Sequence, residues 1–270
     1  MIRLEQCPVC KGISLTPFSS WDHPKEHRRF VKCDDCDHLF AAEFSPEELD
    51  RVYRDSYYPS ADDPKIQEWI EANRDIWNET VNDIFRFRKE FSSILDYGAG
   101  TGGFLECFKA AVSGNLRITA IESSAAAIEN IQNRFPGSCV CSTLDECVGT
   151  KFDCIAVLQC FEHLSNPLEI CRELHSRLSS GGIMVVTVPN RNSLMTLLKG
   201  RKDRCNPGNI THLQFFHEKG MVNMLKQAGF RKILRLSNYP EHGGFFQKSI
   251  IYLFRKLGIS SELRFICIAD

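Results

Sequence analysis

The sequence has no large excess of either charge and no long apolar run. Lysine and arginine total 33 against 34 aspartates and glutamates, a net charge of −1 at pH 7, so the composition gives no electrostatic footprint for nucleic acid. No segment reaches the roughly 20 apolar residues that span a membrane. The N-terminal MIRLEQCPVC also lacks the apolar core of a secretory signal. We therefore expect a cytoplasmic protein whose partner is neither a membrane nor a nucleic acid.

The length of 270 residues suffices for one hydrophobic core and a small additional module. The apolar fraction of 43% and the charged fraction of 25% are typical of a globular protein. Thirteen cysteines are many for this length. Because no secretory signal precedes them, we expect reduced thiols with metal ligands among them.

Two CxxC pairs lie near the N-terminus, at Cys7, Cys10, Cys33 and Cys36. Four thiolates so arranged can close tetrahedrally on zinc, and the metal would supply stability that so short a segment does not obtain from a core. The spacing is a little longer than in the usual zinc ribbon. A redox pair and a chance arrangement are the alternatives, although no thioredoxin-like context follows either pair. We expect structural Zn²⁺ in a small, ribbon-like zinc-binding head at residues 1–44.

The segment ILDYGAGTGGFL, residues 94–105, has the pattern of a buried strand that turns through glycines into a helix. Such a turn points backbone N–H groups at an open crevice, where a cofactor's polar end can bind. Glycines 98, 100 and 102 fit the GxGxG loop of S-adenosylmethionine enzymes, whereas 98, 100 and 103 fit the GxGxxG loop of dinucleotide enzymes. Glu122, after the next apolar run, can accept bonds from ribose hydroxyls in either case. Asp96, two residues before the first glycine, favours methyl transfer.

Strand and helix patterns alternate from Ser92 onward. We predict strands at 93–97, 116–121, 138–142, 153–158, 182–188, 230–236 and 263–269, and helices at 103–112, 124–134, 144–149, 167–179, 218–228 and 245–257. Such alternation with apolar strands implies an α/β fold with a doubly wound, mostly parallel seven-stranded sheet covered on both faces. We assign this domain to residues 92–270. Residues 45–91 are expected to form a helical linker or lid, with Trp69 and Trp77 packed in the core.

Taken together, these motifs resemble those of the class I S-adenosylmethionine-dependent methyltransferases. The resemblance covers residues 92–270 and rests on LDYGAGTG, Glu122, FDCIAVLQCFEHLSNP, GGIMVVTVPN and THLQFFHEKGMVNMLKQAGF in that order. It implies the Rossmann-like methyltransferase fold and S-adenosyl-L-methionine as cofactor. The N-terminal CPVC, KCDDC and SPEELDRVYRDSYY resemble the zinc-binding head of methyltransferases of sugar and polysaccharide biosynthesis. Asp37 departs from that pattern, because a glycine usually follows the last cysteine.

The resemblance also implies which residues contact the cofactor. They are Asp96, Gly98, Gly100, Gly102, Glu122, Ser142, Thr143, Leu144 and Gln159. The glycines would lie against the methionine part, Asp96 would support their loop and Glu122 would take the ribose hydroxyls. Residues 142–144 would flank adenine, and Gln159 would border the methionine end.

Glu162 and His163 are the best candidates for acceptor chemistry. An imidazole that titrates near neutrality can remove a proton from a hydroxyl or an acidic carbon as the methyl group arrives, and the adjacent acid can orient the acceptor. The alternative is that both residues only shape their loop. His212, in a motif of the family, would face the acceptor or hold a loop. Related ubiquinone-pathway O-methyltransferases link this Glu-His pair and an acid three residues before it to a divalent cation. Gln159 occupies that position here, so we do not expect metal-assisted catalysis.

The sequence predicts a methyltransferase that acts on a small-molecule acceptor, with an activated sugar favoured over a quinone or phenol. Three alternatives remain: an RNA methyltransferase that recruits RNA through the zinc head, a non-catalytic binding module and a nicotinamide-dependent oxidoreductase. The nine cysteines outside the head are interpreted as small core residues. They are those at 107, 139, 141, 147, 154, 160, 171, 205 and 267.

Overall fold

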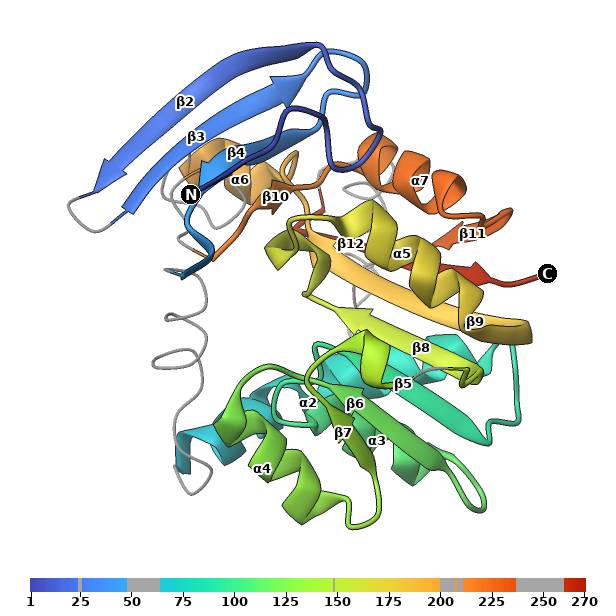
Figure 1. Ribbon diagram of the computed structural model, residues 1–270. Coiled ribbons are helices and arrows are strands. Elements are labelled where there is room, and N and C mark those ends of the chain that lie inside the picture. Colours follow the sequence, from blue (N-terminus) through green and yellow to red (C-terminus); the bar gives the residue numbers. More distant parts are fainter. Residues whose placement is uncertain (24–25, 48–63, 148, 200–206, 208–210, 237–259) are drawn as a thin grey trace.

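The computed structural model describes the chain except for residues 24–25, 48–63, 148, 200–206, 208–210 and 237–259 (Figure 1). Three predictions therefore fall wholly or partly outside the described residues: the helix at 245–257, the environment of Cys205 and the 48–63 part of the expected helical linker. The described residues form two β-sheets, one of seven strands and one of five. Helices cover both faces of the larger sheet, and the smaller sheet lies beside it (Figure 1).

The larger sheet contains all seven strands that the sequence predicts. They are β5 (Ser93–Tyr97), β6 (Arg117–Ile121), β7 (Cys139–Cys141), β8 (Phe152–Leu158), β9 (Leu178–Pro189), β11 (Lys232–Arg235) and β12 (Glu262–Ile268). Their order across the sheet is β11-β12-β9-β8-β5-β6-β7. Every neighbouring pair is parallel except the two made by β12, which runs antiparallel to β9 and β11. The predicted mostly parallel sheet is confirmed.

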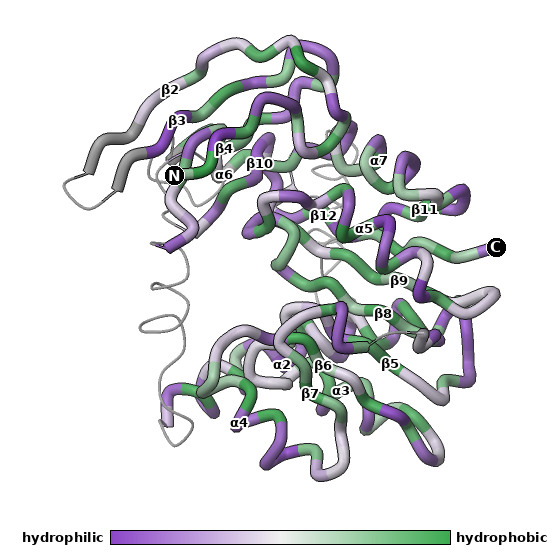
Figure 2. The backbone as a smooth tube through the Cα atoms, in the orientation of Figure 1, coloured by the Kyte–Doolittle hydropathy of each residue, from purple (hydrophilic) through white to green (hydrophobic). Residues whose placement is uncertain are grey.

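Two layers of helices bury the faces of this sheet. One layer holds α2 (Pro64–Phe85), α3 (Gly103–Ala111) and α4 (Ala125–Arg134), and the other holds α5 (Pro167–Ser176) and α7 (Glu218–Gln227). Successive strand residues face opposite layers: Ile94 packs in the first and Leu95 in the second. Both faces are buried, so the strands are continuously apolar rather than alternating. Figure 2 shows these apolar residues along the central strands and polar residues on the outer helices.

Some predicted boundaries differ from the structure. The expected helix at 144–149 is a single 3₁₀ turn, η1 (Leu144–Cys147), and the expected helix at 167–179 ends at Ser176. Strand β9 begins at Leu178, opposite Phe152, and resumes its pairing at Ile183, opposite Cys154. The residues between leave the ladder as an irregularity that includes Gly181 at φ 65°. None of the described helices combines the length and apolarity that crossing a bilayer requires.

The smaller sheet combines N-terminal strands with one strand from far along the chain. Its members are β1 (Ile2–Arg3), β2 (Leu15–His23), β3 (Glu26–Cys33), β4 (Leu39–Phe44) and β10 (Gln214–Phe215). The order is β1-β4-β3-β2, and β10 also pairs with β4. The antiparallel β2–β3 hairpin therefore occupies most of the segment between the two CxxC pairs. A two-residue strand such as β10 has no recognisable sequence pattern, so the sequence did not predict it.

Helix α2 packs on the start of α3 through one close approach. Trp77 is 9% exposed, and a Cβ atom on Gly103 would lie 2.2 Å from its indole ring. A side chain at position 103 would therefore push the two helices apart. Trp69, which lies on the same helix, contacts Trp77 edge-on at 5.3 Å between ring centroids, but its side chain is 47% exposed. The expectation that Trp69 packs in the core is thus wrong, because the buried face of α2 follows Ile66, Ile70 and Trp77 and leaves Trp69 at its margin.

Replacement of Gly103 by alanine should lower the free energy of unfolding by about 1–3 kcal/mol, because the new methyl group overlaps the indole. Urea unfolding of Gly103→Ala measures this loss. In a Trp77→Leu background the same substitution should have a clearly smaller effect, since the overlapping ring atoms are gone. Equal losses in the two backgrounds would contradict the proposed contact.

Candidate active site

A cavity of about 740 Å³ opens at the edge of the larger sheet where its parallel strands end. Its walls come from the glycine bend after β5, the end of β8, the start of β12 and one side of α2. Seven residues expected at a functional site line it: Asp96, Gly98, Gly100, Gln159, Glu162, His163 and His212. The structure therefore brings the predicted cofactor loop and the predicted acceptor residues to one cavity.

The bend between β5 and α3 depends on left-handed backbone conformations. Gly98, Gly100 and Gly102 have φ values of 78°, 54° and 78°, a region that favours glycine. Gly98 also lacks room for a side chain, since a Cβ atom there would lie 2.7 Å from the Cys160 sulfur. Gly102 caps α3 and is buried away from the cavity lining. The glycines thus serve both the turn and the close approach of neighbouring chain.

Glu122 braces this bend from the end of β6. Its carboxylate accepts hydrogen bonds from the backbone N–H groups of Gly100 (2.8 Å), Ser123 (2.8 Å) and Ser124 (3.0 Å), and the residue is 8% exposed. Glu122 therefore faces the glycine bend, although it does not line the cavity itself. A carboxylate has about four acceptor positions, so three backbone bonds leave capacity for one more donor.

The segment expected to flank adenine lies beside Glu122 and outside the cavity lining. The Glu122 N–H donates to the Cys141 carbonyl at 3.1 Å, which places residues 142–144 next to the end of β6. Ser142 and Thr143 are exposed, whereas Leu144 is buried. The structure therefore places this segment at the same sheet edge, on the other side of the glycine bend from the cavity.

Asp96 is a buried acid at the floor of the cavity. It is 2% exposed, and no described residue donates a hydrogen bond to its carboxylate. Burial, and then the charge of Glu122, raises its pKa to about 8. The group is therefore mostly protonated at pH 7, and a cation bound nearby would favour its ionised form.

Residues that the sequence did not identify complete the cavity wall. The Thr101 hydroxyl lines the cavity and is buried without a hydrogen-bond partner among the described residues. Arg264 on β12 is 2% exposed and donates to the Thr80 hydroxyl (2.9 Å) and the Asp83 carboxylate (3.3 Å) of α2. Thr101 stands inside the glycine motif and could have been found there. The sequence around Arg264 does not indicate a site residue, because it has the pattern of an apolar strand.

Gln159 links three strands at the cavity edge. Its amide nitrogen donates to the hydroxyl of Thr187 on β9 at 3.3 Å and to the carboxylate of Glu262 on β12 at 2.9 Å. Its φ of 52° is left-handed, which is unfavourable for a residue with a side chain. These contacts hold the residue in that conformation at the end of β8.

Glu162, His163 and His212 form a compact cluster on the opposite wall. His163, in the 3₁₀ turn η2 (Phe161–His163), hydrogen-bonds through Nδ1 to the carbonyl oxygen of Thr211 at 2.9 Å. A carbonyl only accepts, so the proton is on Nδ1 and Nε2 is the basic nitrogen. Nε2 lies 3.9 Å from Glu162 Oε1.

Burial dominates the electrostatics of this cluster. It lowers the pKa of His163 to about 4, although the bond to Thr211 opposes the shift, so the imidazole is neutral at pH 7. The His163 and His212 rings meet edge-on at 4.9 Å between centroids. Potential ligand atoms of Glu162, His163 and His212 lie within 4.8 Å of one another, so the trio could also hold a divalent ion.

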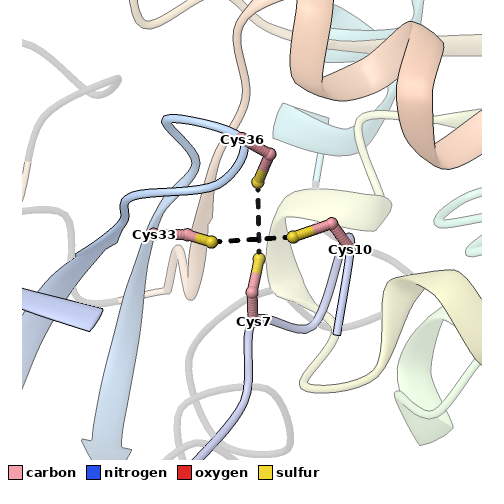
Figure 3. A group of neighbouring side chains, drawn as sticks. All are labelled: Cys7, Cys10, Cys33 and Cys36. Carbon is pink, nitrogen blue, oxygen red and sulfur yellow. Dashed lines mark hydrogen bonds between the residues drawn. The ribbon is translucent and has the colours of Figure 1, made fainter. Parts of the chain in front are cut away.

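The four head cysteines converge on one point (Figure 3). The Sγ atoms of Cys7 and Cys36 are 3.7 Å apart and those of Cys10 and Cys33 are 3.6 Å apart, and all four lie within 4.8 Å of one another. A zinc tetrahedron with Zn–S bonds of about 2.3 Å has S–S edges of about 3.8 Å. The cysteines therefore fit a four-thiolate zinc site.

The two CxxC turns share the same backbone geometry. Lys11 N–H donates to the Cys7 carbonyl and Asp37 N–H to the Cys33 carbonyl, both at 2.9 Å. The residue after each second cysteine is left-handed, with φ 64° at Lys11 and 60° at Asp37. Aspartate tolerates this conformation better than most residues, so the turn forms although a glycine is usual there. The Asp37 carboxylate also contacts Lys32 (3.0 Å) and Arg191 (2.8 Å).

Hydrogen bonds connect the head to the residues beside the cavity. Strand β10 pairs Gln214 with Phe40 of β4, and the Gln214 amide nitrogen donates to the Leu164 carbonyl at 2.8 Å. Buried His38, whose pKa falls to about 3 because of burial, contacts the Gln214 side-chain oxygen through Nε2 at 2.9 Å. Arg28 of β3 donates to the carbonyl of His212 at 3.3 Å. The head therefore holds the chain that carries His212.

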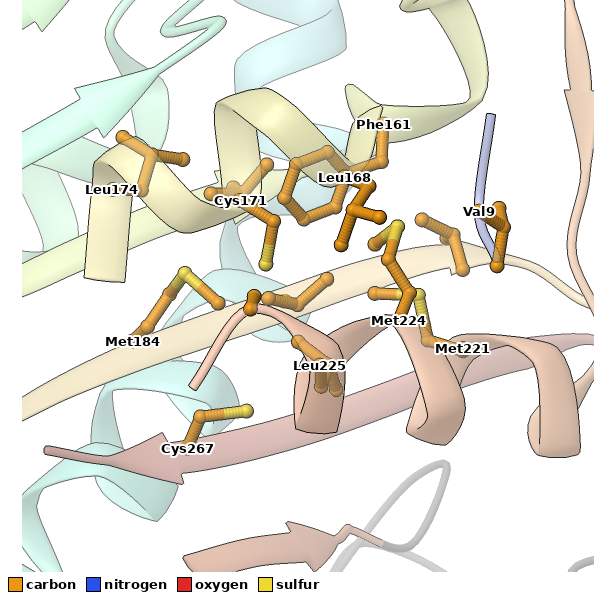
Figure 4. Packing of buried hydrophobic residues seen from close by; sticks show 14 of the residues in the cluster. Val9, Phe161, Leu168, Cys171, Leu174, Met184, Met221, Met224, Leu225 and Cys267 are labelled. Atoms are coloured by element: carbon orange, nitrogen blue, oxygen red, sulfur yellow. The ribbon is translucent and has the colours of Figure 1, made fainter. Parts of the chain in front are cut away.

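The head also shares the core of the larger sheet. Val9, between the first two cysteines, packs in the cluster that contains Phe161, Leu168 and Met224 (Figure 4). Phe161 begins the turn that presents Glu162 and His163. Both packing and hydrogen bonds thus connect the head to the part of the chain that forms the Glu162-His163-His212 cluster.

A family model matches more than half of the chain. Residues 69–234 match the model of a family described as a methyltransferase domain. No curated protein matches the sequence at a significant level. A S-adenosylmethionine-dependent methyltransferase from Archaeoglobus fulgidus is similar in structure, with a TM-score of 0.54, 18% identity and coverage of 75% of this chain and 97% of that one.

Two further solved structures show the same fold. The plantazolicin methyltransferase BamL, solved with a triazolic desmethylPZN analogue and SAH, has a TM-score of 0.54 and 18% identity, and the match covers 82% of this chain and 94% of that one. Streptomyces venezuelae DesVI has a TM-score of 0.53 and 17% identity, with 79% and 100% covered. At these identities the likeness shows the fold.

Proposed function

Since the chain belongs to the methyltransferase domain family and is an S-adenosylmethionine-dependent methyltransferase, we propose that it methylates a small-molecule acceptor, a sugar nucleotide or a related biosynthetic intermediate, at carbon or oxygen. The observation that carries this proposal is the single cavity that joins the glycine bend to the Glu162-His163-His212 cluster. A volume of about 740 Å³ suits a small ligand beside part of a cofactor. None of the twelve described cysteines forms a disulfide, which supports the proposed cytoplasmic location.

The residues around the glycine bend fit the cofactor. Gly98 and Gly100 would admit its methionine part, Gln159 would border it, and Asp96 would face its positive charge. Glu122 would accept a ribose hydroxyl with the capacity that its backbone bonds leave. Residues 142–144 would flank adenine, beside Glu122. The cofactor supplies a methyl group on a sulfonium, which is already electrophilic, so the protein's task is alignment and exclusion of water.

His163 is proposed as the proton acceptor for the substrate. Its Nδ1 proton is donated to the Thr211 carbonyl, so Nε2 is the basic atom. Nε2 lies on the side of Glu162. Glu162 would orient the acceptor hydroxyl, and His212, held from the head, would form the adjoining wall. The low pKa makes the imidazole a weak base. Proton removal is therefore expected to accompany methyl arrival rather than to precede it.

The substrate class is tested with labelled cofactor. The protein is incubated with methyl-labelled S-adenosylmethionine and, separately, sugar nucleotides, phenols and RNA. We expect label in a sugar nucleotide. Transfer to RNA, with binding that weakens steeply as salt rises, would favour the RNA alternative. Cofactor binding without transfer to any small molecule would argue against the proposed substrate class.

Cofactor affinity should rise with pH between about 6 and 7.5. Asp96 is protonated in the empty cavity, with a pKa of about 8, and a bound cation lowers that pKa, so binding releases a proton. The association constant should increase by up to about tenfold per pH unit. Calorimetry in two buffers of different ionisation enthalpy measures the released proton.

In Asp96→Asn the affinity should be lower and the proton release should disappear. Asp270→Asn, an exposed acid at the end of the described chain, serves as the matched control and should behave as the wild type. Unchanged proton release in Asp96→Asn would remove Asp96 from this role.

Replacement of His163 by alanine should slow turnover far more than it weakens cofactor affinity. Loss of a positioned general base typically lowers the rate by about 100- to 10,000-fold. Steady-state assays give the turnover number, and calorimetry on the same variant gives the cofactor dissociation constant. Turnover equal to that of the wild type would assign His163 a loop-shaping role instead.

We also propose that the head binds one structural Zn²⁺ through Cys7, Cys10, Cys33 and Cys36. Removal of the metal with a chelator should lower both the melting temperature and activity, since the head holds His212, and added zinc should restore both. Cys36→Ser should retain less zinc by elemental analysis. A metal-free protein with an unchanged melting temperature would rule the site out.

A further inference from the structure

A second group of thiols lies at the far edge of the larger sheet. Cys139 and Cys141, two apart on β7, point to the same side of the strand. Cys147 in η1 returns to them, with its Sγ 3.2 Å from that of Cys141, and the Cys139 and Cys141 sulfurs are 3.5 Å apart. The sequence suggests small core residues here. Cys139 contradicts that interpretation, because it is exposed.

The three sulfurs have the arrangement of a ligand set. All lie within 4.8 Å of one another, as do the four sulfurs of the head. None forms a disulfide. Packing of a core does not account for three sulfurs on one short segment when one of them is at the surface. Soft thiolate ligands select soft metal ions.

We propose that Cys139, Cys141 and Cys147 form a second metal site, which binds a soft d¹⁰ ion through three thiolates. Each thiol releases its proton to solvent as its sulfur bonds the metal. The S–S distances would widen from 3.2 and 3.5 Å to about 3.8 Å, the edge set by metal–sulfur bonds of about 2.3 Å. This change is small, and β7 is the edge strand among the described strands of its sheet, where it pairs with β6 alone.

The site would be independent of the head and adjacent to the cofactor segment. Cys141 immediately precedes residues 142–144, and its carbonyl accepts the Glu122 N–H at 3.1 Å. A metal that joins Cys141 to Cys147 would therefore close the segment 142–146 into a ring. If the proposed cofactor position is right, that ring fixes the adenine flank. The metal site itself does not depend on that position.

Cadmium provides the probe. The full chain is loaded anaerobically with ¹¹³Cd²⁺ alone, and ¹¹³Cd nuclear magnetic resonance distinguishes four-sulfur from three-sulfur coordination by chemical shift. We expect two resonances, one of each kind, and two equivalents in a titration of the cadmium–thiolate charge-transfer absorbance. One equivalent with only the four-sulfur resonance would overturn the proposal.

Cys139→Ser tests the assignment of the site with little risk to folding, because the residue is exposed. It should lose the three-sulfur resonance and one of the two equivalents while keeping the four-sulfur resonance. Cys107→Ser, a buried cysteine on α3, is the matched control and should keep both. A second equivalent that survives in Cys139→Ser, or a Cys141–Cys147 disulfide in place of metal uptake, would contradict the site. Neither measurement uses the cofactor, so failure here leaves the proposed methyl transfer untouched.

Discussion

The pairing of β4 with β10 is the contact on which the candidate site depends. Two residues of β10 join a sheet whose other strands lie 170 or more positions earlier in the chain. Ala41 N–H extends the contact to the Leu213 carbonyl at 2.8 Å. Leu213 in turn donates its N–H to the carbonyl of Glu162 at 2.7 Å. Backbone hydrogen bonds therefore connect the cysteine-bearing sheet directly to the turn that presents His163.

The position of the cavity follows from the order of the strands. The chain leaves β5 to form β6 and β7 on one side and then crosses to β8 on the other, so loops diverge at the ends of β5 and β8. Ligands bind at such switch points in open α/β sheets because the diverging loops leave a crevice. The left-handed residues Gly98, Gly100 and Gln159 all occur there. Three left-handed residues thus lie where the chain turns sharply beside the buried Asp96.

The sequence predicted the larger sheet well because its signals are local. Apolar runs and the glycines between them located all seven strands, and strand ends identified Gly98 and Gln159, two of the residues that line the cavity. The smaller sheet was missed because most of its strands are polar or very short. The β2–β3 hairpin is polar in sequence, and β10 has only two residues. Trp69 and Cys139 show the same limit, since helical or strand spacing identifies a face but not whether another element covers it.

Strand β12 is antiparallel to its neighbours, so its last residues lie far from the cavity. Its first residues, Glu262 and Arg264, reach the cavity. Its last residue, Ile268, pairs with Ile183 at the opposite ends of the strands, away from the cavity. In a fully parallel sheet the final strand would instead finish at the cavity. A fluorescent label or affinity handle attached to a cysteine introduced at Asp270 would therefore emerge on the far side, so immobilising the protein through that position would leave the cavity mouth unobstructed.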